Sequence, residues 1–533
     1  MTESHPETES HLEIERKYDA AADFDLPDLS GLPGVAGVRD TAPVRLHAAY
    51  FDTGDLRLAA RGITLRRRRG GADAGWHLKL PAADGRLEVR APLGRARAVP
   101  ARLASLVAAY TRGEPLRHIA TLDTDRRVTV LLDEDGAPLA EVADDRVVGT
   151  VVHDTGRNSG TGSETEITPG ASRWREVEVE LVNGPPTLLK AARKRLRKAG
   201  ARDSASSSKL GRLLDGVRGL PAPRKPPPAE DGQSAGDVVL RQLHAQVETL
   251  LRLDPEARRG TDDAVHQMRV AARRTRAVLR AYAPLFDTER TRPIEDELKW
   301  LGGVLGEVRD LEVLRMRLAA RVAELDGPAR PEPLGPGTLV RVDDPVPRVP
   351  SWLEDLARQE RAAYRRMNAT LRESRYFALL DALEDLVADP PLTARARRPA
   401  AEEMPALLKR SRKRLVRERA ALDGRPEDVE SARHDVRKAA KRVRYAAETA
   451  VPVLGAEAGR TARDAKAVQS ALGDHMDALI TMRRIERIAA RVRDPAEAFA
   501  LGRIHGVERR EADASLARFT GTRTGARREA GKN

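Results

Sequence analysis

Acidic and basic side chains recur at every second position in several short segments of the N-terminal half. Two such segments carry Glu13, Glu15 and Lys17, and Glu176, Glu178 and Glu180. Side chains two residues apart share one face of a β-strand, and a row of carboxylates can hold a hard divalent cation such as Mg²⁺ through oxygen. The spacing therefore predicts a metal site built on strands.

Three further predicted strands show the same alternation. Arg66 and Arg68 share a face of the first, Lys79 lies on the second, and Glu141 and Asp145 lie on the third. One strand of this kind could be the solvated face of an open sheet, but several together favour a closed barrel with a charged lumen. Arg and Lys can bind phosphate oxygens there, Arg as a bidentate fork. We therefore expect a metal–polyphosphate ligand.

A histidine-led basic pattern occurs twice in the C-terminal half. Its members are His266, Arg269, Arg273 and Arg276, and then His434, Arg437, Lys441 and Arg444. The spacing i, i+3, i+7, i+10 puts all four side chains on one helix face. If these were ordinary Arg-rich surface helices, the same histidine-led pattern would not be expected twice. The histidines are not part of an HxxxH arrangement, so metal binding by them is not favoured. A Leu-Gly-x3-Asp segment also recurs, ending at Asp310 and Asp477, so we predict a duplicated bundle that binds an extended polyanion.

The elements that position these residues fall into two classes. Residues 1–218 show the period-two alternation that predicts short strands. Residues 237–520 have the pattern of helices, with two repeats over about 237–325 and 403–500. Prolines mark a linker over 219–236 and an irregular insertion over 326–350, and 521–533 form a basic tail. The predicted fold class is multidomain α+β, with an antiparallel β barrel followed by an all-α bundle.

Composition narrows the partners. The 533 residues carry a formal net charge of +13, which favours polyanions. Aromatic residues make up only 3%, too few for the stacking platforms that bind single-stranded nucleic acid, so specific nucleic-acid binding is not expected. The absence of cysteine excludes thiolate metal sites. The sequence contains no apolar run of about 18 residues, so no membrane span is predicted. We expect a cytoplasmic protein, with association with polyphosphate granules left open.

The N-terminal blocks resemble, in order, those of the CYTH superfamily, the triphosphate tunnel metalloenzymes. The matching segments are Glu13–Lys17 (ExExK), Tyr50–Thr53 (YFDT), Leu65–Arg68 (LRxR), Lys79, Glu141–Asp145 (ExxxD), Glu176–Leu181 (ExExEL) and Ser208–Lys209 (SK). The family's strand arginine could be Arg126 or Arg127. We assign it to Arg127, because Val128 and Val130 would put Arg126 on an apolar face.

The resemblance implies an eight-stranded tunnel that hydrolyses a linear triphosphate with Mg²⁺ or Mn²⁺. It implies phosphate contacts from Lys17, Arg66, Arg68, Lys79, Arg127 and Lys209. It implies metal binding by Glu13, Glu15, Glu178 and Glu180, with Glu141, Asp145 and Glu176 as further ligands or groups that position water. Glu13, Glu15, Lys17 and Glu176 are the catalytic candidates, and spacing does not decide which carboxylate orients the water.

The helical half resembles the CHAD domain, on the two stripes and the two Leu-Gly-x3-Asp segments. This resemblance implies inorganic polyphosphate as a partner. Three alternatives stay open: a non-catalytic polyphosphate anchor, a tunnel enzyme that acts on an organic triphosphate (a thiamine triphosphatase or an adenylate cyclase), and generic nucleic-acid binding that polyphosphate would not compete away.

Overall fold

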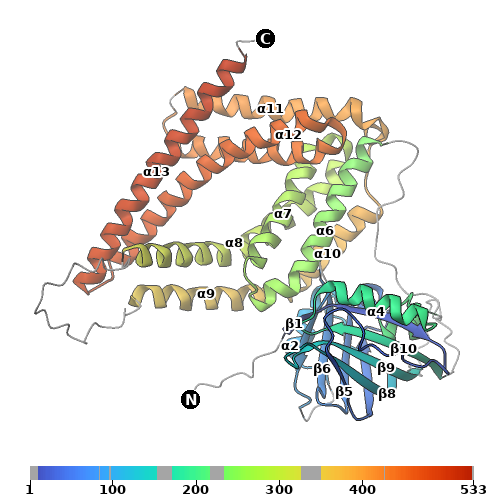
Figure 1. Cartoon of the computed structure of the whole chain (residues 1–533). Coiled ribbons are helices and arrows are strands. Elements are labelled where there is room, and N and C mark those ends of the chain that lie inside the picture. The colour runs from blue at the N-terminus through green and yellow to red at the C-terminus, as the bar shows by residue number, and fades with distance from the viewer. Residues whose placement is uncertain are drawn as a thin grey trace, which may run out of the picture. The chain divides into compact units, whose positions relative to one another are not determined.

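The chain forms two compact units, residues 1–223 and 224–533. The computed structural model describes residues 10–82, 85–94, 98–152, 171–215, 233–325, 350–424 and 426–530. The first unit is built on an antiparallel sheet and the second is helical (Figure 1). Most of the predicted linker, nearly all of the 326–350 insertion and the last residues of the basic tail lie outside the described residues.

The sheet of the first unit contains eleven strands among the described residues. They are β1 (Ser10–Glu13), β2 (Glu15–Ala20), β3 (Gly37–Asp40), β4 (Val44–Asp52), β5 (Thr64–Arg69), β6 (Gly75–Ala82), β7 (Gly85–Ala91), β8 (Arg117–Leu132), β9 (Pro138–Val151), β10 (Ser172–Leu181) and β11 (Arg202–Asp203). Their order is β1-β7-β6-β5-β4-β8-β9-β10-β2-β11, with β3 beside β8. The strands outnumber the eight predicted because the first is divided at Ile14 and two short edge strands, β3 and β11, are added.

The division at Ile14 shows how the sheet curves. β1 pairs with β7 near one end of the path, whereas β2 pairs with β10 and β11 near the other. Only Ile14 separates β1 from β2, and its carbonyl accepts a bond from the amide of Leu181. The series of hydrogen-bonded strands does not close on itself, but the continuous segment β1–β2 pairs with strands near both ends of the series. The sheet therefore bends round as a tunnel, as predicted.

Apolar side chains pack on both faces of this curved sheet. One cluster packs α4 (Pro186–Lys198) on β2, β9 and β10, and Figure 1 shows this helix lying across the strands. A second packs α1 (Arg57–Ala60), α2 (Ala101–Leu106) and α3 (Ala108–Thr111) on β5–β7. A third includes α5 (Lys209–Leu214) and the opposite strand face, at Leu122 and Val147. A Cβ on Gly149 would lie 2.8 Å from Leu213, so glycine allows α5 to pack closely inside the curve.

The second unit consists of long helices. They are α6 (Ala235–Arg259), α7 (Ala264–Ala281), α8 (Thr288–Leu325), α9 (Ser351–Thr370), α10 (Ser374–Ala388), α11 (Ala400–Asp423), α12 (Val429–Ala489) and α13 (Pro495–Ala530), with 3₁₀ turns at Ala283–Leu285 and Ala394–Arg397. Figure 1 shows α11 beside α12 and α8 beside α9, and these pairs are in contact. An apolar stripe on α7, which includes Met268, Ala272 and Leu279, is buried.

The repeat is visible in the helix order. Long helices α6 and α11 each precede a helix that carries one basic stripe. In the first copy a 3₁₀ turn separates α7 from α8, whereas in the second a kink at Gly455, whose φ is 55°, divides α12. The two stripe helices pack together: the hydroxyl of Tyr282 donates to the carbonyl of Ala446 at 2.7 Å. The duplication thus brings both basic stripes to one place.

Candidate active site and basic pocket

One side of the tunnel gathers carboxylates. Glu180 faces Glu15 directly in the β10–β2 ladder, and Glu13 follows on β1. Burial, and then the charges of Glu13 and Glu15, raise the pKa of Glu180 to about 7. Lys79 lies 2.6 Å from Glu13 and Lys17 lies 3.2 Å from Glu15, whereas no cation lies within ion-pair distance of Glu180 in the described part of the chain. A bound cation would remove the remaining repulsion, so this end of the lumen fits a divalent metal through oxygen ligands.

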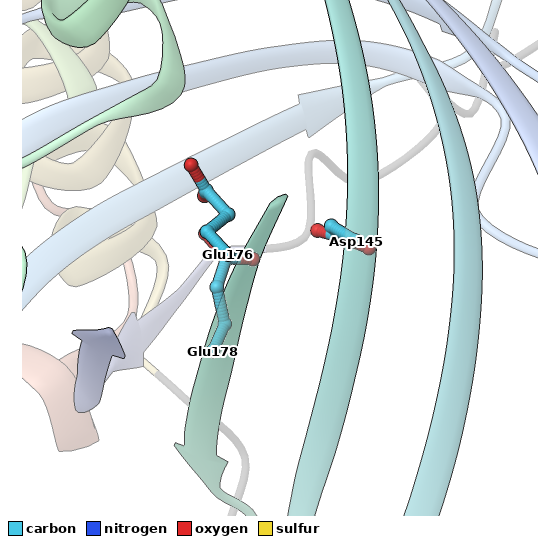
Figure 2. A group of neighbouring side chains, drawn as sticks. All are labelled: Asp145, Glu176 and Glu178. Carbon is cyan, nitrogen blue, oxygen red and sulfur yellow. The ribbon is translucent and has the colours of Figure 1, made fainter. Parts of the chain in front are cut away.

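A second carboxylate group surrounds a buried lysine. Glu176 and Glu178 come from β10 and Asp145 from β9 (Figure 2). Lys209 lies 2.9 Å from Asp145, 2.8 Å from Glu176 and 2.7 Å from Glu178. Burial opposes its charged form, but these carboxylates raise its pKa. A metal ion would have to compete with Lys209 here, so we rank this group below the Glu13–Glu15–Glu180 group as a metal site.

Arg126 completes the second group. It donates from Nε to Asp145 at 2.8 Å and from Nη2 to Asp145 at 2.6 Å and Glu178 at 2.9 Å. Lys17 also donates to Glu178 and lies 3.2 Å from Glu15. Lys17 thus bridges the two carboxylate groups and brings them into one continuous site.

The opposite wall carries an excess of positive charge. Arg66 has one hydrogen-bond partner among the described residues, the hydroxyl of Tyr50 at 3.4 Å. Arg68 is 4% exposed and pairs with Asp73. Burial, and then the charges of Arg66 and Arg126, lower the pKa of Arg68 to about 9. Buried like charges of this kind favour an anion with several oxygens, such as a phosphate chain.

Helix α5 and strand β4 position these groups through backbone contacts. Ser208 caps α5, since its hydroxyl accepts from the amide of Gly211 at 2.9 Å, and Lys209 is the first residue of that helix. Asp52 is fully buried and accepts from the amides of Leu58 at 2.9 Å and Ala59 at 2.8 Å. The segment that resembles YFDT therefore organises α1, and its aspartate has a structural role.

In the helical unit, α7, α8 and α12 enclose a pocket of about 420 Å³. All of its charged lining side chains are basic: Arg269, Arg273, Arg276, Arg280, Lys299, Lys438, Lys441 and Arg442. Arg273 donates to the hydroxyl of Tyr445 at 3.2 Å across the α7–α12 contact. Burial, and then Arg437, Arg273 and Arg269, lower the pKa of Lys441 to about 7. The pocket thus concentrates positive charge from both repeats.

The repeated Leu-Gly-x3-Asp segments position one arginine in each stripe. A Cβ on Gly306 would lie 3.5–3.7 Å from three guanidinium atoms of Arg269, and one on Gly473 would lie 3.3–3.7 Å from those of Arg437. Each glycine thus lets a guanidinium lie against the facing helix. Asp310 is 3.8 Å from Arg269. The glycines of the two segments therefore position one arginine in each stripe, and Asp310 adds an ionic contact in the first.

The two histidines lie on the same helices but outside the pocket lining. Burial and nearby cations lower the pKa of both, chiefly Arg309 at His266 and Lys438 at His434. Both imidazoles are therefore mainly neutral at pH 7. The Nδ1 atom of His434 is buried and makes no hydrogen bond within the described part of the chain. The histidines can contribute hydrogen bonds more readily than charge.

Comparison with known proteins identifies the two domains. The CYTH domain family matches residues 11–212, and the CHAD domain family matches residues 241–486. The uncharacterized protein Rv2226 of Mycobacterium tuberculosis (strain ATCC 25618 / H37Rv) is 39% identical over 446 residues, which cover 82% of this chain and 81% of the relative. The chain belongs to the family of proteins that join a CYTH domain to a CHAD domain. The recognised domain order and the fold class are thereby confirmed.

Three other proteins are similar to parts of this chain. The uncharacterized protein MT2285 of M. tuberculosis (strain CDC 1551 / Oshkosh) has the same identity and coverage as Rv2226. The solved structure of PptA from Streptomyces chartreusis is 24% identical and covers 55% of this chain and 100% of its own, with a TM-score of 0.42. The CHAD domain of the plant Ricinus communis is 22% identical and covers 56% of this chain and 96% of its own, with a TM-score of 0.41.

The CYTH unit brings most of the predicted site residues together. The predicted members of the lumen wall are Glu13, Glu15, Lys17, Arg66, Arg68, Lys79, Asp145, Glu176, Glu178, Glu180 and Lys209. Glu141 lies opposite Glu180 in the ladder but is exposed at the strand end, so its place as a ligand stays a prediction. The CYTH family is metal-dependent, and the carboxylate groups provide candidate ligands.

The assignment of the strand arginine to Arg127 is wrong. Arg126 binds Asp145 and Glu178, while Arg127 points to the other face of β8 and is exposed. The assignment assumed that the inner face excludes apolar residues. Val128 shares the inner face with Arg126 by the period of the strand, and Leu122 packs there against α5. Charged and apolar side chains therefore share the lumen.

Two buried lumen residues were missed. Glu88 on β7 is 1% exposed and contacts His77 at 2.9 Å, Lys79 at 3.8 Å and Arg90 at 2.5 Å. Burial opposes ionisation of Glu88, but the hydrogen bond with His77 and the charge of Lys79 lower its pKa. Burial lowers the pKa of His77 to about 4. Glu88 alternates with Leu87 and Val89, so the spacing that identified the other carboxylates could have identified it.

The sequence predicts no membrane-spanning segment. Within the described ranges, every helix is too short or too polar to cross a bilayer.

Proposed function

We propose that the CYTH unit hydrolyses inorganic triphosphate with Mg²⁺ or Mn²⁺, and that the CHAD unit binds inorganic polyphosphate. One observation carries the first part: a single buried lumen contains two separate groups of like charge. The charges of Glu13 and Glu15 raise the pKa of Glu180 at one place, and the charges of Arg66 and Arg126 lower the pKa of Arg68 at another. A metal-loaded phosphate chain supplies the opposite charge to both groups at once.

The acidic and basic residues have different proposed roles. Glu13, Glu15 and Glu180 would hold the divalent cation, with Glu178 adjoining them through Lys17. When bound, the cation neutralises phosphate oxygens and makes water at the site a stronger nucleophile. Arg66, Arg68 and Arg126 would bind the remaining oxygens and stabilise the charge that develops on the transferred and leaving groups. Lys209 holds the carboxylates of Asp145, Glu176 and Glu178 in place.

The test is phosphate release from inorganic triphosphate, ATP, thiamine triphosphate and long-chain polyphosphate, each with Mg²⁺, Mn²⁺ or EDTA. We expect turnover of inorganic triphosphate to exceed that of the other substrates and to stop in EDTA. Faster turnover of ATP or thiamine triphosphate would assign the tunnel to an organic substrate. No turnover with any metal, together with retained triphosphate binding, would make the CYTH unit an anchoring site.

Polyphosphate binding by the CHAD unit should depend on pH through Lys441. Its free pKa is about 7, and the surrounding charges are Arg437, Arg273, Arg269 and Asp477. A bound polyanion favours the charged lysine, so above that pKa binding requires proton uptake, whereas below it the lysine is already charged. We expect binding to be about tenfold weaker at about pH 8.5 than at about pH 6.5.

The matched variant is Lys441→Arg, which stays charged across this range. We expect the affinity of Lys441→Arg to change little between the two pH values when measured by calorimetry with long-chain polyphosphate. An equal pH dependence in both proteins would show that another group takes up the proton.

A further inference from the structure

The two halves of the CHAD unit are not equivalent at their basic surfaces. The first copy forms the pocket between α7, α8 and α12, with Gly302 and Gly303 on its α8 wall. A Cβ on either glycine would meet nothing within 4 Å, so both border open space. Aligning the two Leu-Gly-x3-Asp segments places Gln469 and Ser470 at the corresponding positions of the second copy. The second copy therefore carries side chains where the first has none.

The first copy also has a positive charge at a position where the second has a negative one. Aligning the two histidine-led stripes matches Arg280 of the first copy with Glu448 of the second. Arg444 donates to Glu448 at 2.7 Å and to Gln469 at 3.4 Å, and Arg274 donates to the same carboxylate at 3.4 Å. The counterpart of Arg444 is Arg276, which has no carboxylate within ion-pair distance in the described part of the chain. The second copy thus neutralises the arginine that the first leaves available.

Resting on the proposed function of the CHAD unit, we propose that polyphosphate binds at only one of the two pseudo-equivalent positions, the pocket between α7, α8 and α12, and that Gly302 and Gly303 make it accessible. The bound segment contacts Arg273 and Arg276 from the first copy and Lys441 from the second. Arg444 supports the helix pair through Glu448 instead of contacting the ligand. This narrows the eight predicted polyphosphate contacts to an asymmetric set.

The first test fills the pocket with Gly302→Gln, the residue found in the second copy. Glutamine favours a helix more than glycine does, so the variant should fold at least as well as the wild type. We expect at least about tenfold weaker binding of long-chain polyphosphate in the full chain, because the side chain occupies the space needed by phosphate contacts. The control is Gly502→Gln, at an exposed glycine of α13 whose Cβ would also meet nothing within 4 Å.

The second test compares Arg276→Ala with Arg444→Ala at corresponding positions. We expect Arg276→Ala to weaken binding by about tenfold and Arg444→Ala to leave it within about twofold. Equal losses in this pair, or wild-type affinity in Gly302→Gln, would overturn the asymmetric site. Failure of the wild-type chain to bind polyphosphate would instead overturn the proposed function of the unit, so the two failures are distinguishable.

Discussion

Arg126→Met is expected to lower kcat/KM for inorganic triphosphate by about 100-fold or more, the usual cost of removing one preorganised donor from a site of charge stabilisation. Arg126 presents a planar fork to the lumen and already holds Asp145 and Glu178. Its replacement removes the proposed phosphate contact. Asp145 then keeps its ion pair with Lys209, and Glu178 keeps its ion pair with Lys17. Steady-state kinetics with saturating Mg²⁺ would measure the effect.

The adjacent residue provides the control. Arg127→Met makes the same chemical change one position along β8, on the exposed outer face, and should leave kcat/KM within about twofold. Because truncating a buried ion pair can destabilise the fold, thermal unfolding should accompany the kinetics, and Arg126→Lys keeps the charge without the fork. A folded Arg126→Met protein with wild-type kcat/KM would remove Arg126 from the phosphate site.

The alternation of charge along the strands was sufficient to predict the tunnel and most of its lining. Period two fixes which side chains share a face, so Glu176, Glu178 and Glu180 had to lie together once that segment formed a strand. The sequence could not show which face was internal at each position. Val128 and Leu122 face inward together with Arg126, and this mixed lining caused the error at Arg127.

Contacts between distant segments were the other part that spacing could not supply. Lys209 follows Glu178 at a large distance along the chain, and only α5 entering the curved sheet brings them to 2.7 Å. Likewise, the repeat predicted two stripes with similar roles. Glu448 and Gln469 belong to the same local pattern as their counterparts, yet their contacts with Arg444 make the copies unequal.

The largest effect in the CHAD unit is expected from reversing two cations, Arg273→Glu with Lys441→Glu. These residues come from opposite repeats and lie among like charges in one pocket. We expect the affinity for long-chain polyphosphate to fall by about 100-fold or more at physiological salt, and the slope of log affinity against log salt to shrink by about two. Hydrolysis of inorganic triphosphate should be unchanged, because the tunnel has its own cations.

Folding should not confound this result, since the reversal relieves repulsion among Arg269, Arg437 and their neighbours. The matched control is Arg410→Glu with Lys413→Glu on exposed positions of α11, which changes the net charge equally. If the control weakens binding as much as the pocket variant, affinity comes from overall charge and the pocket is not a site. If the pocket variant loses hydrolysis of inorganic triphosphate and binding of polyphosphate together, the two units are not independent.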